Sequence, residues 1–210
     1  MRWAGWLIAI VVVAGLCWLF PLFRIVPLER AAREKTAAVF DPKRFAETFW
    51  DGQLPQALGK ALPAATLLLT IQTNATDAKQ KFARSVGVSE SYTYFLAGKG
   101  RVLSMSEDEL LLAITANATN AEVSLQLGLL FSNAVRDGPG MLNVNDYPNS
   151  QDFNAISEAL NRIVEERVQP KLRKQVKIGA TIEFVGCAEV NDEANDLRPL
   201  KVVPIQVAIP

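Results

Sequence analysis

The sequence predicts an α+β protein with an N-terminal transmembrane helix, short helices, and an OB-like five-stranded β-barrel with a helix between strands 3 and 4. Three observations predict it: an uncharged apolar run at residues 3–23, alternating polarity before residue 132, and further alternation after an amphipathic stretch at 153–168. Alternation is typical of half-buried strands, and apolar steps of three and four are typical of helices. An OB-fold barrel has this element order. A small sandwich with one packed helix would share it.

The length of 210 residues allows one anchor and one domain of ordinary size. We expect a membrane anchor at residues 1–28, a helical juxtamembrane region at 29–75 and the OB-like β-barrel domain at 76–210. Residues 3–23 carry no charge and, at about 1.5 Å per residue, would span a hydrocarbon core of roughly 30 Å. A cleaved signal peptide would have a small-residue exit, which is missing here, so we expect an uncleaved helix.

In the juxtamembrane region, Asp41 and Pro42 predict a helix start, because aspartate caps helices and proline is tolerated at the first helical position. Gly52, Pro55 and Pro63 then predict a division into short helices.

Five strands are predicted, at Tyr92–Leu103, Glu109–Thr115, Val123–Phe131, Val176–Phe184 and Val203–Ile209. Gly98 and Gly100 indicate a bulge or a close backbone approach in the first strand, and Pro204 indicates an edge position for the last. Residues 117–120 form the turn into the third strand. The helix after that strand carries its apolar residues on one face, at Phe153, Ile156, Leu160, Ile163, Val164 and Val168.

The composition excludes several classes of function. Lysine plus arginine and aspartate plus glutamate both number 22, so there is no overall basic excess, and we expect no nucleic-acid partner. The absence of histidine excludes Ser-His-Asp and Cys-His arrangements and histidine-ligated zinc. Of the two cysteines, Cys17 lies in the apolar run and Cys187 is expected to be a small buried hydrophobe. We expect no catalytic residues, no metal and no cofactor.

The densest polar cluster lies in the long connection between the third strand and the helix. Its candidate ligand-binding residues are Asn133, Arg136, Asp137, Asp146, Asn149 and Gln151. Amides and an Arg-Asp pair offer the paired donors and acceptors that sugar hydroxyls need. Alternatively, Asn149 or Ser150 caps the helix, Arg136 pairs with Asp137 and the rest is solvated turn. Residues 133–140 are predicted to form a polar turn without regular structure, because they include Gly138, Pro139 and Gly140.

A second acidic stretch, at residues 191–196, offers oxygens to calcium but lacks the glycine and closing glutamate of a calcium loop, so a solvated hairpin is expected.

Three stretches, at residues 23–28, 39–50 and 128–154, carry a resemblance to a known family. They begin with Phe-Arg-Ile-Val-Pro-Leu and Val-Phe-Asp-Pro-Lys-Arg-Phe, and the third includes the Arg136-Asp137 turn. The chain resembles a bacterial family of predicted periplasmic lipoproteins, a domain of unknown function, whose genes tend to lie beside ribose-type sugar ABC transporters. Two departures stand out: Leu16 precedes Cys17, where lipidation needs a small residue, and Ser150 separates an asparagine and a glutamine that are expected to be adjacent in the family.

The positive charges that follow the apolar run, at Arg24, Arg30, Arg33 and Lys35, would place the domain in the cytoplasm. The resemblance implies the periplasm instead. We therefore expect a bacterial inner-membrane protein with a single pass at residues 3–23 and its domain in the periplasm.

The resemblance implies a membrane-anchored periplasmic accessory or binding module associated with a sugar ABC uptake system. Its expected partners are transporter subunits or a small carbohydrate. One alternative is a structural subunit of a membrane complex. The other is a periplasmic carbohydrate-active enzyme, with Asp137 and Asp146 as acid and base.

Overall fold

The computed structural model describes residues 40–86, 90–147 and 149–209, so the predicted membrane helix at 3–23 lies outside this part. Within it, no helix combines the length and apolarity needed to cross a membrane. Residues Asp41–Pro210 form one compact unit.

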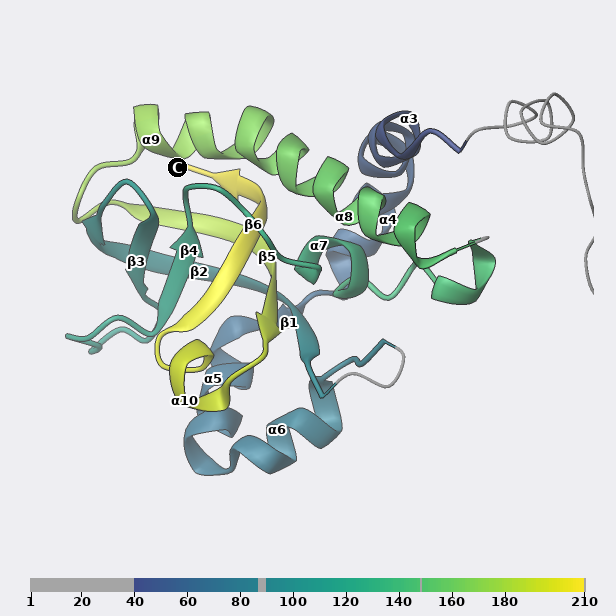
Figure 1. Ribbon diagram of the computed structural model, residues 1–210. Coiled ribbons are helices and arrows are strands. Elements are labelled where there is room, and N and C mark those ends of the chain that lie inside the picture. The colour runs from purple at the N-terminus through teal and green to yellow at the C-terminus, as the bar shows by residue number, and fades with distance from the viewer. Residues whose placement is uncertain (1–39, 87–89, 148, 210) are drawn as a thin grey trace, which may run out of the picture. The chain divides into compact units, whose positions relative to one another are not determined.

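One sheet organises this unit (Figure 1). Its strands are β1 (Leu62–Pro63), β2 (Tyr92–Met105), β3 (Glu109–Ala113), β4 (Val123–Gln126), β5 (Thr181–Val190) and β6 (Leu200–Ala208). Their order is β1-β2-β3-β4-β6-β5, and β2 also pairs with β5. The predicted fold class is therefore wrong, because the sheet has six strands and is not a closed five-stranded barrel. The unforeseen strand is β1, where Leu62 pairs with Leu96 in a region whose prolines predicted only helices.

Strands β4 and β5 differ most in their bounds from the prediction. Strand β4 ends at Gln126, because Gly128 has a φ of 147° and leads the chain away from its neighbours. Strand β5 starts only at Thr181, because Val176 still donates its N–H to Leu172 of the preceding helix and Gly179 turns the chain with a φ of 85°.

Strand β6 lies between β4 and β5, but β4 pairs only with residues 200–202, so at Pro204 strand β6 is paired on one side, with β5. The ladder between β5 and β6 shifts register between Val185 and Gly186, next to the position where Pro204 faces Gly186. Such an irregularity accommodates a residue that has no N–H to donate.

At Gly98 the structure has a close approach and no bulge, since β2 pairs with β5 without interruption there. A Cβ atom on Gly98 would lie 2.8 Å from the Cβ of Ala64, the first residue of helix α5. The irregularity in β2 lies further along, between Val102 and Ser104 in its pairing with β3.

The α-helices are α3 (Pro42–Thr48), α4 (Leu54–Ala57), α5 (Ala64–Thr73), α6 (Ala75–Phe82), α7 (Ala134–Asp137), α8 (Ser150–Ile163), α9 (Gln169–Gln175) and α10 (Glu193–Asp196). Shorter 3₁₀ and π turns are η1 (Phe49–Gln53), η2 (Leu58–Lys60), η3 (Val144–Asp146) and η4 (Val164–Val168). The predicted helix start is confirmed, because the Asp41 carboxylate accepts hydrogen bonds from the backbone N–H groups of Lys43 and Arg44. The prediction of no regular structure at residues 133–140 is wrong, because Ala134–Asp137 form helix α7. Helices α6 and α10 were not predicted either.

Helices α8 and α9 form one long rod with η4 between them (Figure 1). The predicted apolar face is confirmed, with Ile156 and Leu160 fully buried. The π turn η4 precedes Pro170, which has no N–H for a regular helical bond. Helix α9 adds Leu172 to the core between the sheet and α5, where Leu67 and Ile71 also pack.

Candidate functional site

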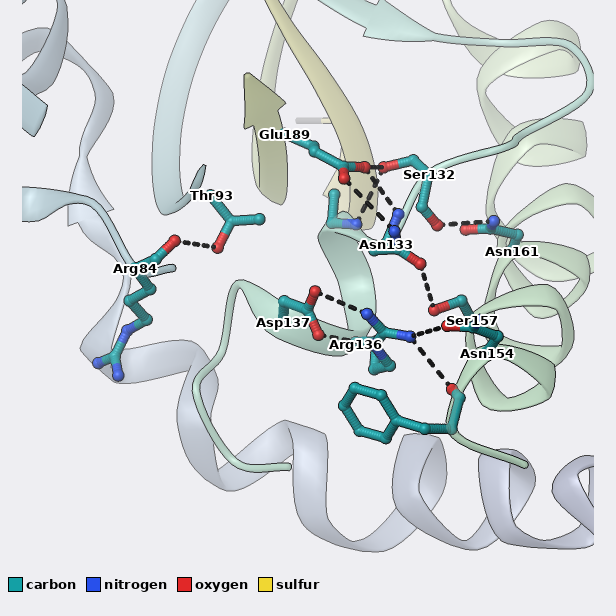
Figure 2. A network of polar contacts seen from close by, with 12 residues as sticks. Arg84, Thr93, Ser132, Asn133, Arg136, Asp137, Asn154, Ser157, Asn161 and Glu189 are labelled. Atoms are coloured by element: carbon teal, nitrogen blue, oxygen red, sulfur yellow. Dashed lines mark hydrogen bonds and ion pairs between the residues drawn. The ribbon is translucent and has the colours of Figure 1, made fainter. Parts of the chain in front are cut away.

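Helix α7 holds the two charged residues of the predicted site, Arg136 and Asp137, in a buried ion pair (Figure 2). The Arg136 guanidinium donates to both carboxylate oxygens of Asp137, at 2.6 and 2.9 Å. It also donates to the carbonyl oxygen of Phe153 and to Oδ1 of Asn154, and it lies 3.8 Å from the centre of the Phe153 ring. The donors of Arg136 are thus used within the protein, and they fasten α7 to α8.

Asn133, just before α7, joins the same network from the other side (Figure 2). Its backbone N–H donates to Oε2 of Glu189 on β5 at 2.7 Å, and its side-chain oxygen accepts from the Ser157 hydroxyl at 2.9 Å. The Ser132 hydroxyl donates to the same Glu189 oxygen at 2.9 Å. These bonds connect β5, the segment before α7 and helix α8.

The remaining predicted residues are exposed and lie in and after η3. Asn149 caps α8, since its Oδ1 accepts from the Asp152 backbone N–H at 2.8 Å. Gln151 lies in the first turn of α8, and Asp146 ends η3. The structure therefore does not gather the predicted residues around one open space. Asn133, Arg136 and Asp137 hold elements together, while Asp146, Asn149 and Gln151 lie at the surface.

A different place in the fold offers room for a ligand. A hollow of about 480 Å³ lies where the β3–β4 connection and the β5–β6 connection meet helix α5. Its polar lining comes from Gln72, Thr115, Asn117, Thr119, Asn120, Glu122 and Arg198. Its apolar lining comes from Leu68, Ile71, Leu197 and Pro199, with Ala118 and Ala121. Asn133, Arg136 and Asp137 do not line it.

Glu122 fixes the shape of the β3–β4 connection. Its carboxylate accepts from the backbone N–H groups of Ile114 and Thr115, both at 2.8 Å, and from the Thr115 hydroxyl. Arg101 on β2 donates to the carbonyl oxygen of Ala118 at 3.1 Å. The connection is therefore held by its own side chains and by the neighbouring strand.

The amide side chains of the hollow remain available. Within the described part of the chain, those of Gln72, Asn117 and Asn120 make no hydrogen bond. An amide offers two N–H donors and one carbonyl acceptor, so together they can satisfy several neighbouring hydroxyl groups. The sequence predicts residues 117–120 only as a turn. The lining comes from three distant segments, so no spacing in the sequence could indicate it.

Several buried groups outside this hollow have shifted pKa values. Burial raises the pKa of Tyr94 to about 12 and that of Tyr92 further, where a hydrogen bond to Glu193 adds to the effect. Burial also raises the pKa of the Cys187 thiol, as expected for an inert core cysteine. Burial by itself would raise the pKa of Asp196. Hydrogen bonds from the backbone of Asp192 and from Lys201 outweigh this effect and hold the pKa below its usual value. None of these groups lines the hollow at α5.

The described residues contain no cluster of histidine, cysteine, aspartate and glutamate that could hold a metal ion. The acidic stretch at 191–196 instead forms the short helix α10. Its Asp192 carboxylate caps the helix by accepting from Ala194, and its Asp196 carboxylate accepts from Asn191 and Asp192.

A model of the family described as "predicted periplasmic lipoprotein (DUF2291)" matches residues 7–208. The chain belongs to this family. The resemblance seen in the sequence is thereby confirmed for the family, while the gene neighbourhood beside sugar transporters stays a prediction. The predicted localisation, with a single-pass helix in the inner membrane, is corrected, because the family description is that of a lipoprotein, which is held by a lipid.

The fold has a solved counterpart. A crystal structure of an OB-fold protein from Thermotoga maritima is similar, with a TM-score of 0.72 and 27% sequence identity. The match covers 82% of this chain and 100% of that chain. No curated protein matches the chain.

Proposed function

We propose that this protein is a periplasmic binding module that takes a small, uncharged, hydroxyl-rich ligand of the carbohydrate class and serves a sugar ABC uptake system. The observation that carries the proposal is the hollow of about 480 Å³ at α5, whose lining combines apolar side chains with the Thr119 hydroxyl and three amides that make no hydrogen bond within the described residues. Its volume lies within the range of small-molecule sites, roughly 300–1,000 Å³.

The charges of the hollow favour an uncharged ligand. Glu122 is occupied by backbone N–H groups, so it has little capacity left for a cation. Arg198 is the other charged residue of the lining, and it is exposed. The amides and hydroxyls that remain can each both donate and accept, which suits the hydroxyl groups of a sugar.

We propose binding without catalysis. The carboxylate pair considered for sugar hydrolysis is Asp137 and Asp146. Asp137 is buried and bound bidentately by Arg136, and Asp146 is exposed on η3. Both carboxylate oxygens of Asp137 accept from Arg136, so neither is available to act on a glycosidic bond.

The ligand proposal is tested by isothermal titration of the full-length protein in mild detergent with a panel of pentoses and hexoses. We expect one class of sugar to bind, and Asn117→Ala and Asn120→Ala each to weaken it by about tenfold, or 1.4 kcal/mol. Gln151→Ala is the matched control, because it removes an exposed amide from α8. If only Gln151→Ala weakens sugar binding, the ligand site lies in the 133–151 connection and not in the hollow at α5. No binding of any sugar would contradict the proposal.

The partner proposal is tested by pulling down tagged full-length protein in mild detergent from cells grown on several sugars. We expect a sugar permease, its ATPase or its binding protein among the recovered proteins. Recovery of the tagged protein alone under every condition would contradict a role in sugar uptake and leave the ligand result standing.

A further inference from the structure

Two large apolar side chains stand out from the segment between β4 and α7. Leu129 is 78% exposed and Phe131 is 92% exposed, whereas their neighbours Leu127 and Leu130 are buried. Alternating exposure of this kind is typical of an extended chain with two different faces. Two large apolar side chains next to one another on a surface are a common mark of an interaction site.

Polar residues on one face of the long helix α8–η4–α9 form hydrogen bonds with the opposite side of this segment. Asn161, Glu165 and Gln169 are spaced four residues apart and therefore lie on one face. Gln169 bonds both the N–H and the carbonyl of Gly128, and Glu165 accepts from the Leu130 N–H at 2.8 Å.

At the far end, Asn161 donates to the carbonyls of Leu130 and Ser132. Every second residue of the segment is thus bonded to the helix. The outward residues, Leu129 and Phe131, are therefore held in place on a fixed backbone.

The backbone of those outward residues is left without a partner. Within the described part of the chain, neither the N–H nor the carbonyl of Leu129 or Phe131 makes a hydrogen bond. An extended segment with free backbone groups on one side is a template for pairing with another strand. Adding an extended peptide to such an edge is a known mode of peptide recognition, in which side-chain contacts set the specificity.

The surroundings of this edge are acidic. A hollow of about 240 Å³ beside it is lined by Gln126, Phe131, Glu189, Asn191, Asp196 and Lys201. The one cation of that lining, Lys201, is paired with Asp196 at 3.0 Å. Glu165 and Arg173 approach the segment from the helix, at Leu130 and Leu127. The carboxylates Glu165, Glu189 and Asp196 therefore outnumber the cations Lys201 and Arg173.

We propose that residues 128–132 form a docking edge for an extended, basic segment of a partner protein. The partner's backbone would pair with the free groups of Leu129 and Phe131, its apolar side chains would pack on theirs, and its lysine or arginine side chains would be attracted by the net negative charge of the surrounding carboxylates. This inference goes beyond the proposed ligand site, since the two hollows share no lining residue.

The test measures binding of labelled octapeptides to the full-length protein in nonionic detergent by fluorescence anisotropy. One peptide alternates lysine and valine, a second alternates glutamate and valine, and a third is the basic peptide with N-methylated backbone. We expect the basic peptide to bind at least about tenfold more tightly than either of the others. Equal binding of the basic and acidic peptides, or of the basic and N-methylated peptides, would overturn the proposal.

Phe131→Ala should weaken the basic peptide about tenfold, as expected of a central interface residue. Because Phe131 is almost fully exposed, this change leaves the core intact. The matched control is Ile178→Ala, which removes an apolar side chain that is 71% exposed elsewhere. Equal effects of the two variants would overturn the proposal. So would a result in which Phe131→Ala changes only self-association in sedimentation or only binding to lipid vesicles, because the occupant would then be a second copy or a membrane.

Measurements of sugar affinity distinguish a failure of this docking proposal from a failure of the proposed sugar site. Phe131→Ala should leave sugar binding unchanged, and Asn120→Ala should leave peptide binding unchanged.

Discussion

At the scale of single residues, the buried charges hold the protein together. Arg136 and Asp137 are each nearly inaccessible, and every bond that Arg136 makes joins α7 to itself or to α8. A buried ion pair is costly to break, since removal of one partner leaves an uncompensated charge in a medium of low polarity. The pair therefore stabilises the position of the segment that precedes it, including Asn133.

Asp137→Ala should lower the free energy of unfolding by about 3–5 kcal/mol, because the Arg136 guanidinium would stay buried without its counter-ion. Urea denaturation of the two proteins measures the difference. Asp146→Ala serves as control, since that carboxylate is exposed, and it should change stability by less than about 0.5 kcal/mol. Equal effects of the two substitutions would contradict a structural role for the pair.

A second prediction at the scale of single residues concerns the pH dependence of stability, and it rests on Tyr94. Its hydroxyl is buried without a hydrogen bond within the described residues, and burial raises its pKa from 10.0 to about 12. The folded state then keeps its proton where the unfolded state has lost it. The resulting stability is complete below pH 10 and is lost as the pH rises toward 12, at up to about 1.4 kcal/mol per pH unit.

Tyr94→Phe should flatten this loss and leave stability at pH 7 unchanged or higher, because it removes an unsatisfied hydroxyl. Denaturation curves at pH 8, 10 and 11 compare the two proteins. A variant that is less stable at pH 7 and keeps the full alkaline slope would show that the Tyr94 hydroxyl is satisfied in the native state.

At the scale of elements, the long helix α8–η4–α9 contacts other parts of the fold through two of its faces. Its apolar face includes Ile156 and Leu160 on α8, which packs against α3 and α7, and Leu172 on α9, which belongs to the same core as the sheet. Its polar stripe, from Asn161 to Gln169, fixes the backbone that leads out of β4. A buried amide that bonds backbone groups on both of its ends contributes more than a surface amide, because its loss leaves buried groups unsatisfied.

Gln169→Ala should therefore lower the free energy of unfolding by about 1–3 kcal/mol through loss of both bonds to Gly128. Gln175→Ala is the matched control, since it removes the same side chain from an exposed position at the end of α9. Thermal or urea unfolding of both variants tests this. Equal changes in the free energy of unfolding for the two variants would show that the polar face of the helix does not stabilise the segment after β4.

At the scale of the whole molecule, the family description requires a cysteine that can carry a lipid. The sequence has two cysteines, Cys17 and Cys187. Cys187 is fully buried on β5, where Gly138 of the turn after α7 packs against its sulfur. A thiol in that position cannot be acylated without unfolding. Cys17 is therefore the acceptor that the sequence leaves, although Leu16 stands before it.

Labelling cells with radioactive palmitate should mark the native protein and the Cys187→Ala variant, and Cys17→Ser should lose the label. Membrane fractionation of the same cells provides the second readout, in which Cys17→Ser is released more readily. Absence of label from the native protein would contradict lipid attachment for this member of the family.

The sequence by itself determined features that rest on local or periodic signals. Asp41 and Pro42 marked a helix start, and the spacing from Phe153 to Val168 marked the buried face of the long helix, because a residue's neighbours within one turn decide both. Alternating polarity located most of β2, β3 and β6 for the same reason. The resemblance on these residues also identified the family.

The tertiary structure decided what depends on segments that are distant in the chain. Strand β1 exists only because β2 lies alongside Leu62, and the backbone after β4 is held at Gly128 by Gln169. Asn133, Arg136 and Asp137 looked like part of a ligand site, yet their side chains bond within the protein and hold its elements together. The open amides lie instead at residues 117–120, beside α5. A sequence shows which groups can form hydrogen bonds, but only packing determines which of them are already satisfied.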